Sequence, residues 1–142
     1  SVKFFDEAIN LETDNAKKAD NAYKAASVLA SAKKLSQARS YAQKAISFNE
    51  NFGAPYILIA QLYAGNYKWN DEPALNKCTF FAAIDKLQRA KAVDPSVAEE
   101  ANKLISSYSA YTPEAKDLFM LGYKAGDRIT IGGWIGETTT IR

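Results

Sequence analysis

The residues best suited to chemistry or to anchoring a partner lie together in 69–78, where Trp69 precedes two carboxylates and the only cysteine. Asp71 and Glu72 offer hard oxygen ligands, but two carboxylates are too few for a cation site. The sequence contains no histidine, so the commonest general base and metal ligand are missing. Cys78 is expected to be buried and inert. We therefore predict no catalytic residue, no cofactor and no metal.

Trp69 itself has two interpretations. An exposed tryptophan in a long loop makes a good interface anchor. The alternative, which we favour, is that its ring folds back over the neighbouring helices.

A second candidate is the glycine-rich tail, with Gly132-Gly133 and Gly136. Their spacing matches no dinucleotide or phosphate-loop fingerprint, and no helix follows to hold a phosphate at its N-terminus. β-Branched residues around the glycine pair predict a hairpin or a short extended ribbon over 127–142. We expect Trp134 and its apolar neighbours to cover the open end of a helical array. The alternative is that the ribbon edge accepts a partner strand.

The composition describes an ordinary folded domain. Hydrophobic residues make up 47% and charged residues 24% of the 142 residues, which is enough apolar material for one core. The net charge of +2 is too small to indicate nucleic acid or an acidic membrane surface as partner. No apolar run reaches the roughly 20 residues that span a bilayer, so we expect no membrane insertion.

Apolar periodicity and turn signals predict helices before the tail. Ser36 is the expected N-cap of the third, Pro55 opens the fourth, and Thr112-Pro113 begins the last. The expected helices cover 1–12, 16–32, 37–48, 56–64, 73–93, 97–108 and about 113–122, with a loop at 65–76.

Small residues recur along this helical region at fixed offsets. Ala83 and Ala90 follow Ala38 and Ala45 by 45 residues, whereas Ala60 follows Ala26 by 34. The difference of 11 residues places an insertion in the loop at 65–76. A period of 34 built from two helices resembles the tetratricopeptide repeat (TPR). The second unit has residues of the expected type at the family's positions: Tyr56, Ile59, Ala60, Tyr63, Ala83, Leu87, Ala90 and Pro95.

The resemblance implies an all-α fold, an α-solenoid of TPR-like helical hairpins, to which the tail adds the short C-terminal β-hairpin or ribbon predicted above. Its units would be an orphan second helix, two repeats, a degenerate third repeat and the tail. We expect this single domain to be the C-terminal part of a longer protein. The expected bounds are 1–12, 16–48, 53–95 (with the inserted loop 65–76), 97–122 and 127–142.

The segment 69–78 and the tail 118–142 look like parts of uncharacterised TPR proteins of Bacteroidota. That resemblance implies a periplasmic or cell-envelope location, with the cytoplasm as the alternative.

Function follows from the resemblance as an expectation. TPR arrays bind peptides or proteins in a concave groove lined by first helices, and we predict a non-catalytic interaction scaffold that binds through this groove, the inserted loop, or both. Only Asn102 fits the lysine and asparagine pattern of carboxylate-clamp repeats, so a receptor for chaperone tails is not expected. The groove positions are small and weakly polar, which favours a short, partly apolar peptide or a neighbouring segment over a highly charged ligand. Tyr23 and Ile57 alternatively only pack between helices. The expected groove positions are Tyr23, Ser27, Ile57, Gln61, Asn102 and Ser106.

Two other functions remain open at this point. One is a C-terminal capping domain without a binding role of its own. The other is an enzyme or carbohydrate-binding module with a site between the Trp69 loop and the Trp134 tail.

Overall fold

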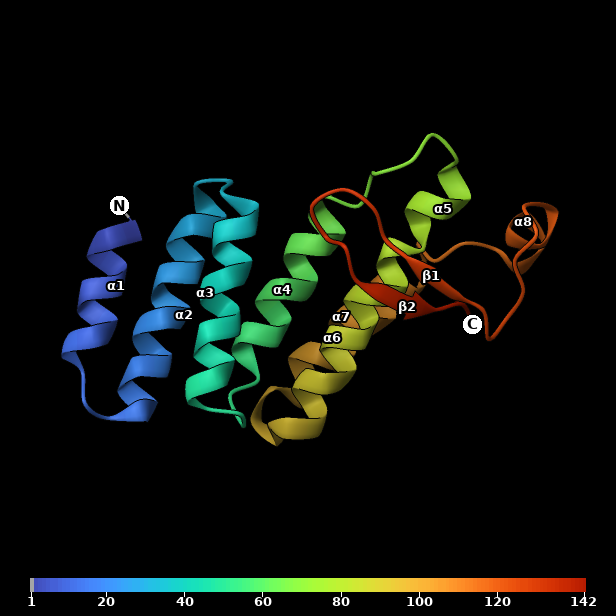
Figure 1. The fold of residues 1–142 in the computed structure, drawn as a ribbon. Coiled ribbons are helices and arrows are strands. Elements are labelled where there is room, and N and C mark those ends of the chain that lie inside the picture. The colour runs from blue at the N-terminus through green and yellow to red at the C-terminus, as the bar shows by residue number, and fades with distance from the viewer. Residues whose placement is uncertain (1) are drawn as a thin grey trace.

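The structure, a computed structural model, describes residues 2–142; Ser1, the first residue of the expected N-terminal helix, lies outside the described residues. Most of the chain is helical, and a small two-stranded antiparallel sheet follows near the C-terminus (Figure 1). This confirms the all-α class with a short C-terminal β element. The elements are α1 (Val2–Leu11), α2 (Asn15–Ser31), α3 (Leu35–Phe48), α4 (Ala54–Gly65), α5 (Pro73–Lys77), α6 (Thr79–Val93), the 3-10 turn η1 (Pro95–Val97), α7 (Ala98–Ser109), α8 (Ala115–Met120), β1 (Arg128–Thr130) and β2 (Thr138–Thr140).

Helices α2 and α3 form the most extensively packed pair, an antiparallel hairpin beside α1 (Figure 1). Alanines line their contact, and without larger side chains the two backbones approach closely. Asp14 caps α2 by accepting a hydrogen bond from the Ala16 amide at 2.8 Å. The expected cap at Ser36 is wrong: α3 begins one residue earlier, at Leu35, without a side-chain cap. The fully buried alanines of the pair are Ala19, Ala22, Ala25, Ala26, Ala38, Ala42 and Ala45.

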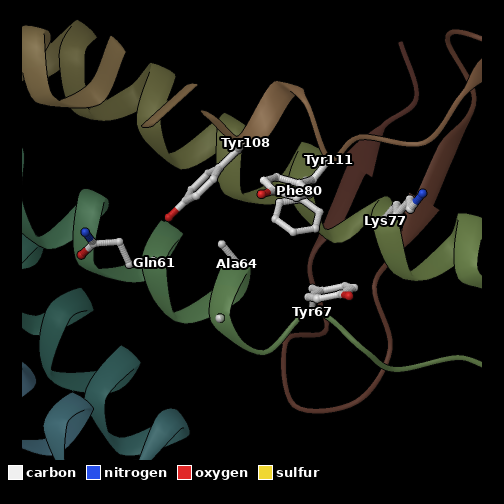
Figure 2. A pocket seen from close by; sticks show the side chains of 8 residues that line it. Gln61, Ala64, Tyr67, Lys77, Phe80, Tyr108 and Tyr111 are labelled. Carbon is white, nitrogen blue, oxygen red and sulfur yellow. The ribbon is translucent and has the colours of Figure 1, made fainter. Parts of the chain in front are cut away.

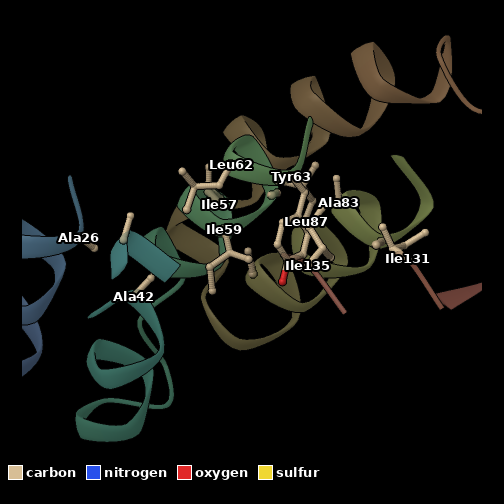
Figure 3. Close-up of a cluster of buried hydrophobic side chains, with 14 of the residues drawn as sticks. Ala26, Ala42, Ile57, Ile59, Leu62, Tyr63, Ala83, Leu87, Ile131 and Ile135 are labelled. Atoms are coloured by element: carbon tan, nitrogen blue, oxygen red, sulfur yellow. The ribbon is translucent and has the colours of Figure 1, made fainter. Parts of the chain in front are cut away.

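Helices α4 and α6 form the centre of the core (Figure 3). Ile59, Tyr63 and Leu87 are almost fully buried there, and small residues such as Ala60 and Ala83 let the two helices approach. Helix α4 is apolar almost all round because it packs against both α3 and α6.

The expected single helix over 73–93 is wrong, because the structure divides it into α5 and α6 at Cys78. The Cys78 amide bonds to Leu75 O in a tight turn. On either side of the break, Asn76 and Thr79 use their side chains to hold the preceding loop. These loop contacts change the direction of the chain between the two helices.

Asp94 joins the end of α6 to the start of α4. Its carboxylate accepts hydrogen bonds from the Gly53 amide at 2.9 Å and from the Ser96 amide at 3.1 Å. The second bond caps η1, which leads into α7. The last helix, α8, begins at Ala115 rather than at Thr112-Pro113, with Glu114 at the cap position.

Strands β1 and β2 pair antiparallel, with Ile129 opposite Thr139. Their inner face packs on α6, where the Thr139 hydroxyl donates to Asp85 at 2.6 Å and Lys86 pairs with Glu137 at 2.6 Å. The ribbon crosses α6 in Figure 1, and the residues between the strands reach back to Arg39 of α3. The tail therefore packs along the side of α6 and α3, which differs from the expected position over the end of the array.

Within residues 2–142, no helix has the length and apolar character needed to cross a bilayer.

Candidate functional site

A cleft of about 450 Å³ lies at the C-terminal end of α4 (Figure 2). We call it the aromatic cleft, because four of the residues that line it carry aromatic rings. Helices α4, α5, α6 and α7, the loop after α4 and the turn after α7 contribute to it, so residues distant in sequence meet there. Its lining residues are Gln61, Ala64, Gly65, Tyr67, Lys77, Phe80, Tyr108 and Tyr111.

Phe80 is the centre of the aromatic cluster. Its ring centroid lies 5.1 Å from that of Tyr67, 5.9 Å from Tyr108 and 5.5 Å from Tyr111. Phe80 itself is only 6% exposed, whereas Tyr111 is 57% exposed. Figure 2 shows Tyr108 reaching from α7 toward α4, with Tyr67 on the opposite side of Phe80. The cleft therefore has a packed floor and an accessible aromatic ring at its mouth, the arrangement that anchors apolar groups.

Local hydrogen bonds position the Tyr67 side of the cleft. The Tyr67 carbonyl accepts from the Thr79 hydroxyl at 2.9 Å, which fixes the loop against the start of α6. Further along the loop, the buried Asn76 side chain accepts from the Trp69 and Asn70 amides at 2.8 and 2.7 Å and donates to the Asn70 carbonyl at 2.7 Å. Asn76 and Thr79 lie on either side of the break between α5 and α6. Their hydrogen bonds to the loop therefore accompany both the break and the position of the Tyr67 wall of the cleft.

Polar groups in the cleft are few. Lys77 is the one charged residue among the described residues that line it, and no ion pair involves Lys77. Gln61 is exposed and adds an amide. Burial raises the pKa of Tyr108 above its ordinary value, so its phenol stays neutral and can donate a hydrogen bond. The site combines an apolar surface with one free cation and neutral donors.

The two tryptophans are not exposed together beside a polar site. Trp69 packs against Gly132 so closely that a Cβ there would lie 2.7 Å from Trp69 Cε3. Trp134 meets Tyr63 edge to face at 5.6 Å and stacks under the Arg39 guanidinium at 5.0 Å. Both indole N–H groups are buried without a hydrogen-bond partner among the described residues. The favoured interpretation of Trp69, as a side chain folded back on the protein, matches this geometry.

The predicted groove residues lie apart from one another. Ile57 is 4% exposed, so it packs inside the core and presents no groove surface. Tyr23 is half-buried edge to face against Phe52, with 5.3 Å between ring centroids, and the Ser27 hydroxyl donates to the Tyr23 carbonyl. For Tyr23 and Ile57 the structure therefore matches the alternative of packing between helices.

The other three groove positions are exposed. Asn102 accepts a hydrogen bond from Lys91 at 2.6 Å, and Ser106 lies one turn further along α7. Gln61 alone among the six lines the aromatic cleft. Sequence reasoning missed the four aromatic residues of the cleft, because no local pattern shows that Tyr67, Phe80, Tyr108 and Tyr111 meet.

The described residues contain no group of three or more histidine, cysteine or carboxylate side chains placed to hold a metal ion. Cys78 is buried, and burial raises the pKa of its thiol to about 11, so a reactive thiolate is not formed near neutral pH.

In comparisons with known proteins, no family model, curated protein or solved structure matches this chain. A functional conclusion therefore has to come from the residues of the cleft and their surroundings.

Proposed function

We propose that this chain is a non-catalytic interaction scaffold of TPR-like helical hairpins that binds a short segment of a partner protein. The aromatic cleft would accept an apolar or aromatic side chain of that segment. One observation carries the proposal: Phe80 organises three tyrosines into a cleft that is open at Tyr111 and closed by the core below. Clefts of about 300–1,000 Å³ with apolar walls and few polar groups are typical of ligand sites.

The repeat interpretation is supported by where the small residues lie. Ala26, Ala60, Ala83 and Ala90, which define the repeat offsets, are buried at helix contacts. The inserted loop then has a clear use, because its first part supplies Tyr67 to the cleft. In such a scaffold the helical repeats supply the stacking, and the inserted loop supplies the Tyr67 wall of the cleft. The cell-envelope location implied by the resemblance stays a prediction.

An enzyme or carbohydrate-binding module is a weaker proposal for this chain. The hollow beside Trp134 is lined by Leu35, Gly65, Asn66, Tyr67, Lys68 and Trp134, without a carboxylate. A glycosidase would need a pair of carboxyl groups facing its substrate. The groups that line the cleft fit recognition better than bond breaking.

Selection of peptides from a random display library tests the proposal, followed by titration of individual selected peptides. Tyr111→Ala removes the exposed ring, and Ala64→Phe fills the cleft from α4. We expect each to weaken binding by about tenfold or more, as loss of an aromatic anchor does. Phe4→Ala is the matched control, because Phe4 is 67% exposed on α1, which lies at one end of the molecule, away from α4, α6 and α7 (Figure 1).

Two results would contradict the proposal. One is a library that yields no enriched peptide. The other is a set of enriched peptides that bind the Tyr111→Ala and Ala64→Phe variants as tightly as the unmodified chain, because binding would then occur elsewhere.

A further inference from the structure

The aromatic cleft is one of three hollows that meet at the end of α4. A second, of about 320 Å³, extends to the turn between α2 and α3, and a third, of about 520 Å³, extends to Trp134. Gly65 lines all three, and Leu35 and Asn66 line both the second and the third. Shared walls make them one continuous depression around the helix end, which we call the α4-end groove.

Gly65 leaves the middle of this groove open. A Cβ added at Gly65 would meet no atom within 4 Å, so the surface there is low and unobstructed. A chain lying in the groove can therefore pass from one hollow to the next across Gly65. This geometry suits an extended segment that crosses the end of α4.

The groove carries positive charge only. Lys77 lines the first hollow, Lys33 the second and Lys68 the third, and none of the residues lining the three hollows is a carboxylate. No ion pair among the described residues involves these lysines. Glu72 and Asp117 lie with Lys77 around a separate hollow, but neither pairs with it. An acidic ligand would find three lysines that have no ion-pair partner among the described residues.

The backbone that carries two of these lysines is held in place. Lys33 adopts a positive φ of 62° in the turn after α2, where its amide bonds to Ala30 O and the next amide bonds to Leu29 O. Lys68 follows Tyr67, whose carbonyl is held by Thr79. The positions from which these side chains extend are therefore fixed before a ligand arrives, which lowers the entropic cost of binding.

We infer that the α4-end groove binds an extended acidic segment of a partner protein. An aromatic or aliphatic side chain of the segment would occupy the aromatic cleft, and carboxylates on either side of it would face Lys33, Lys68 and Lys77. The inference rests on the proposed function and adds the ligand class and its path. A protein segment fits better than nucleic acid, because three lysines on a chain of net charge +2 form a small electrostatic footprint for a phosphate backbone.

Charge reversal of the groove tests the inference. The variant Lys33→Glu/Lys68→Glu/Lys77→Glu is compared with Lys3→Glu/Lys17→Glu/Lys24→Glu, three exposed lysines on α1 and α2 without ion pairs. Circular dichroism verifies that both variants fold. Peptides selected on the unmodified chain should contain acidic residues beside an aromatic or aliphatic one. Their affinity should fall about tenfold or more in the groove variant and less than about twofold in the control.

A second variant tests the extended path. Ser31→Gln places a longer side chain at the second hollow, and Ser31 is an exposed residue that does not line the aromatic cleft. A selected peptide should lose affinity for this variant, whereas a truncated peptide that keeps only its aromatic anchor should bind unchanged.

The failures of the two proposals can be told apart. Selected peptides without acidic residues, or equal affinity for the groove and control variants, would overturn the acidic ligand. If Tyr111→Ala still abolished binding, the scaffold function would stand. Equal affinity of the full peptide for the Ser31→Gln variant and the unmodified chain, or equal loss of the full and truncated peptides, would overturn the extended path. Tighter binding of an oligodeoxythymidine than of any selected peptide would also overturn the inference, and a library without enrichment would overturn both proposals.

Discussion

The Arg39 side chain connects the C-terminal tail to helices α3 and α4. Its guanidinium donates to the carbonyls of Ile135 and Trp134 at 2.6 and 2.8 Å and to the Tyr63 hydroxyl at 3.0 Å. The same group stacks on the Trp134 ring. Burial, together with the nearby Glu137 carboxylate, raises the pKa of Tyr63, so its hydroxyl remains a neutral partner. Arg39→Met keeps most of the aliphatic stem and removes every one of these polar contacts.

The magnitude follows from the number and kind of these contacts. A hydrogen bond from a charged donor contributes about 1.5–3 kcal/mol. Arg39 is half-buried, and the two freed tail carbonyls can bind water once the tail loosens. We therefore expect Arg39→Met to lower the free energy of unfolding by roughly 2–4 kcal/mol rather than by the full sum. For a domain of this size that corresponds to a fall in Tm of roughly 5–15 °C.

Urea unfolding gives the total effect, and amide hydrogen exchange shows where it occurs. Exchange should accelerate most in 128–141, because the tail loses its contact with α3 while the α2–α3 hairpin keeps its own core. Arg39→Lys should restore little, since an ammonium cannot span three acceptors as a guanidinium does. Arg89→Met is the control: Arg89 is exposed on α6 and makes no hydrogen bond or ion pair among the described residues. A loss below about 0.5 kcal/mol, or acceleration spread evenly over the chain, would refute the argument.

Three further predictions concern close packing, pH and the thiol. Gly132→Ala should lower the free energy of unfolding, measured in urea, by about 1–3 kcal/mol, because the added Cβ would lie 2.7 Å from the Trp69 ring. Gly65→Ala is the control, because a Cβ at Gly65 meets no atom within 4 Å, and it should be neutral or mildly stabilising. Hydrogen bonds from Ser96 and Gly53 lower the pKa of Asp94 below 3.8. The Asp94 carboxylate therefore contributes its full stabilisation above pH 3.8, and this stabilisation is lost as the pH falls through the lowered pKa of the folded state. Asp94→Asn should remove this pH dependence, so that its stability measured in acid falls less steeply with pH. Cys78, fully buried with its pKa raised to about 11, should react with a thiol reagent only as fast as the chain opens, and reaction as fast as that of the urea-unfolded chain would contradict its burial.

The helical region was accessible to sequence reasoning because its signals are local. Alanine and leucine at helical spacing mark buried faces, and Ala26, Ala60 and Ala83 are indeed buried in the structure. Proline and the Asp94-Pro95 pair mark helix boundaries within a residue or two. Even the β ribbon follows from β-branched residues around a glycine pair. All of these depend on neighbours within one or two turns of the chain.

The site depends instead on contacts that no local pattern contains. Phe80 and Tyr108 face each other only because α6 and α7 pack together, and Tyr67 joins them only because Thr79 captures its carbonyl. The tail position is likewise set by Arg39, almost a hundred residues earlier in the chain. Periodicity gives the face of a helix but not which neighbour meets it, so the predicted groove included the buried Ile57 and omitted the aromatic cleft.

Asn76 connects the inserted loop to the proposed site, and its substitution separates packing from recognition. Its side chain is buried and makes three hydrogen bonds to the Trp69 and Asn70 backbone. Asn76→Ala would leave two amides and one carbonyl without partners, at a cost of about 2–4 kcal/mol in the free energy of unfolding if they stay buried. If the loop instead opens to water, the stability loss is smaller, but Tyr67 moves and affinity for a selected peptide falls.

For Asn76→Ala we therefore expect a lower free energy of unfolding in urea, a lower affinity for the selected peptide in titration, or both. Asn76→Asp keeps both acceptor bonds but replaces the donor to the Asn70 carbonyl with a carboxylate oxygen, so it should lie between the alanine variant and the unmodified chain near neutral pH. An Asn76→Ala variant as stable and as tightly binding as the unmodified chain would show that the loop is held by Trp69 packing on Gly132 alone. In that case the hydrogen bonds of Asn76 would not be what positions the Tyr67 wall of the cleft.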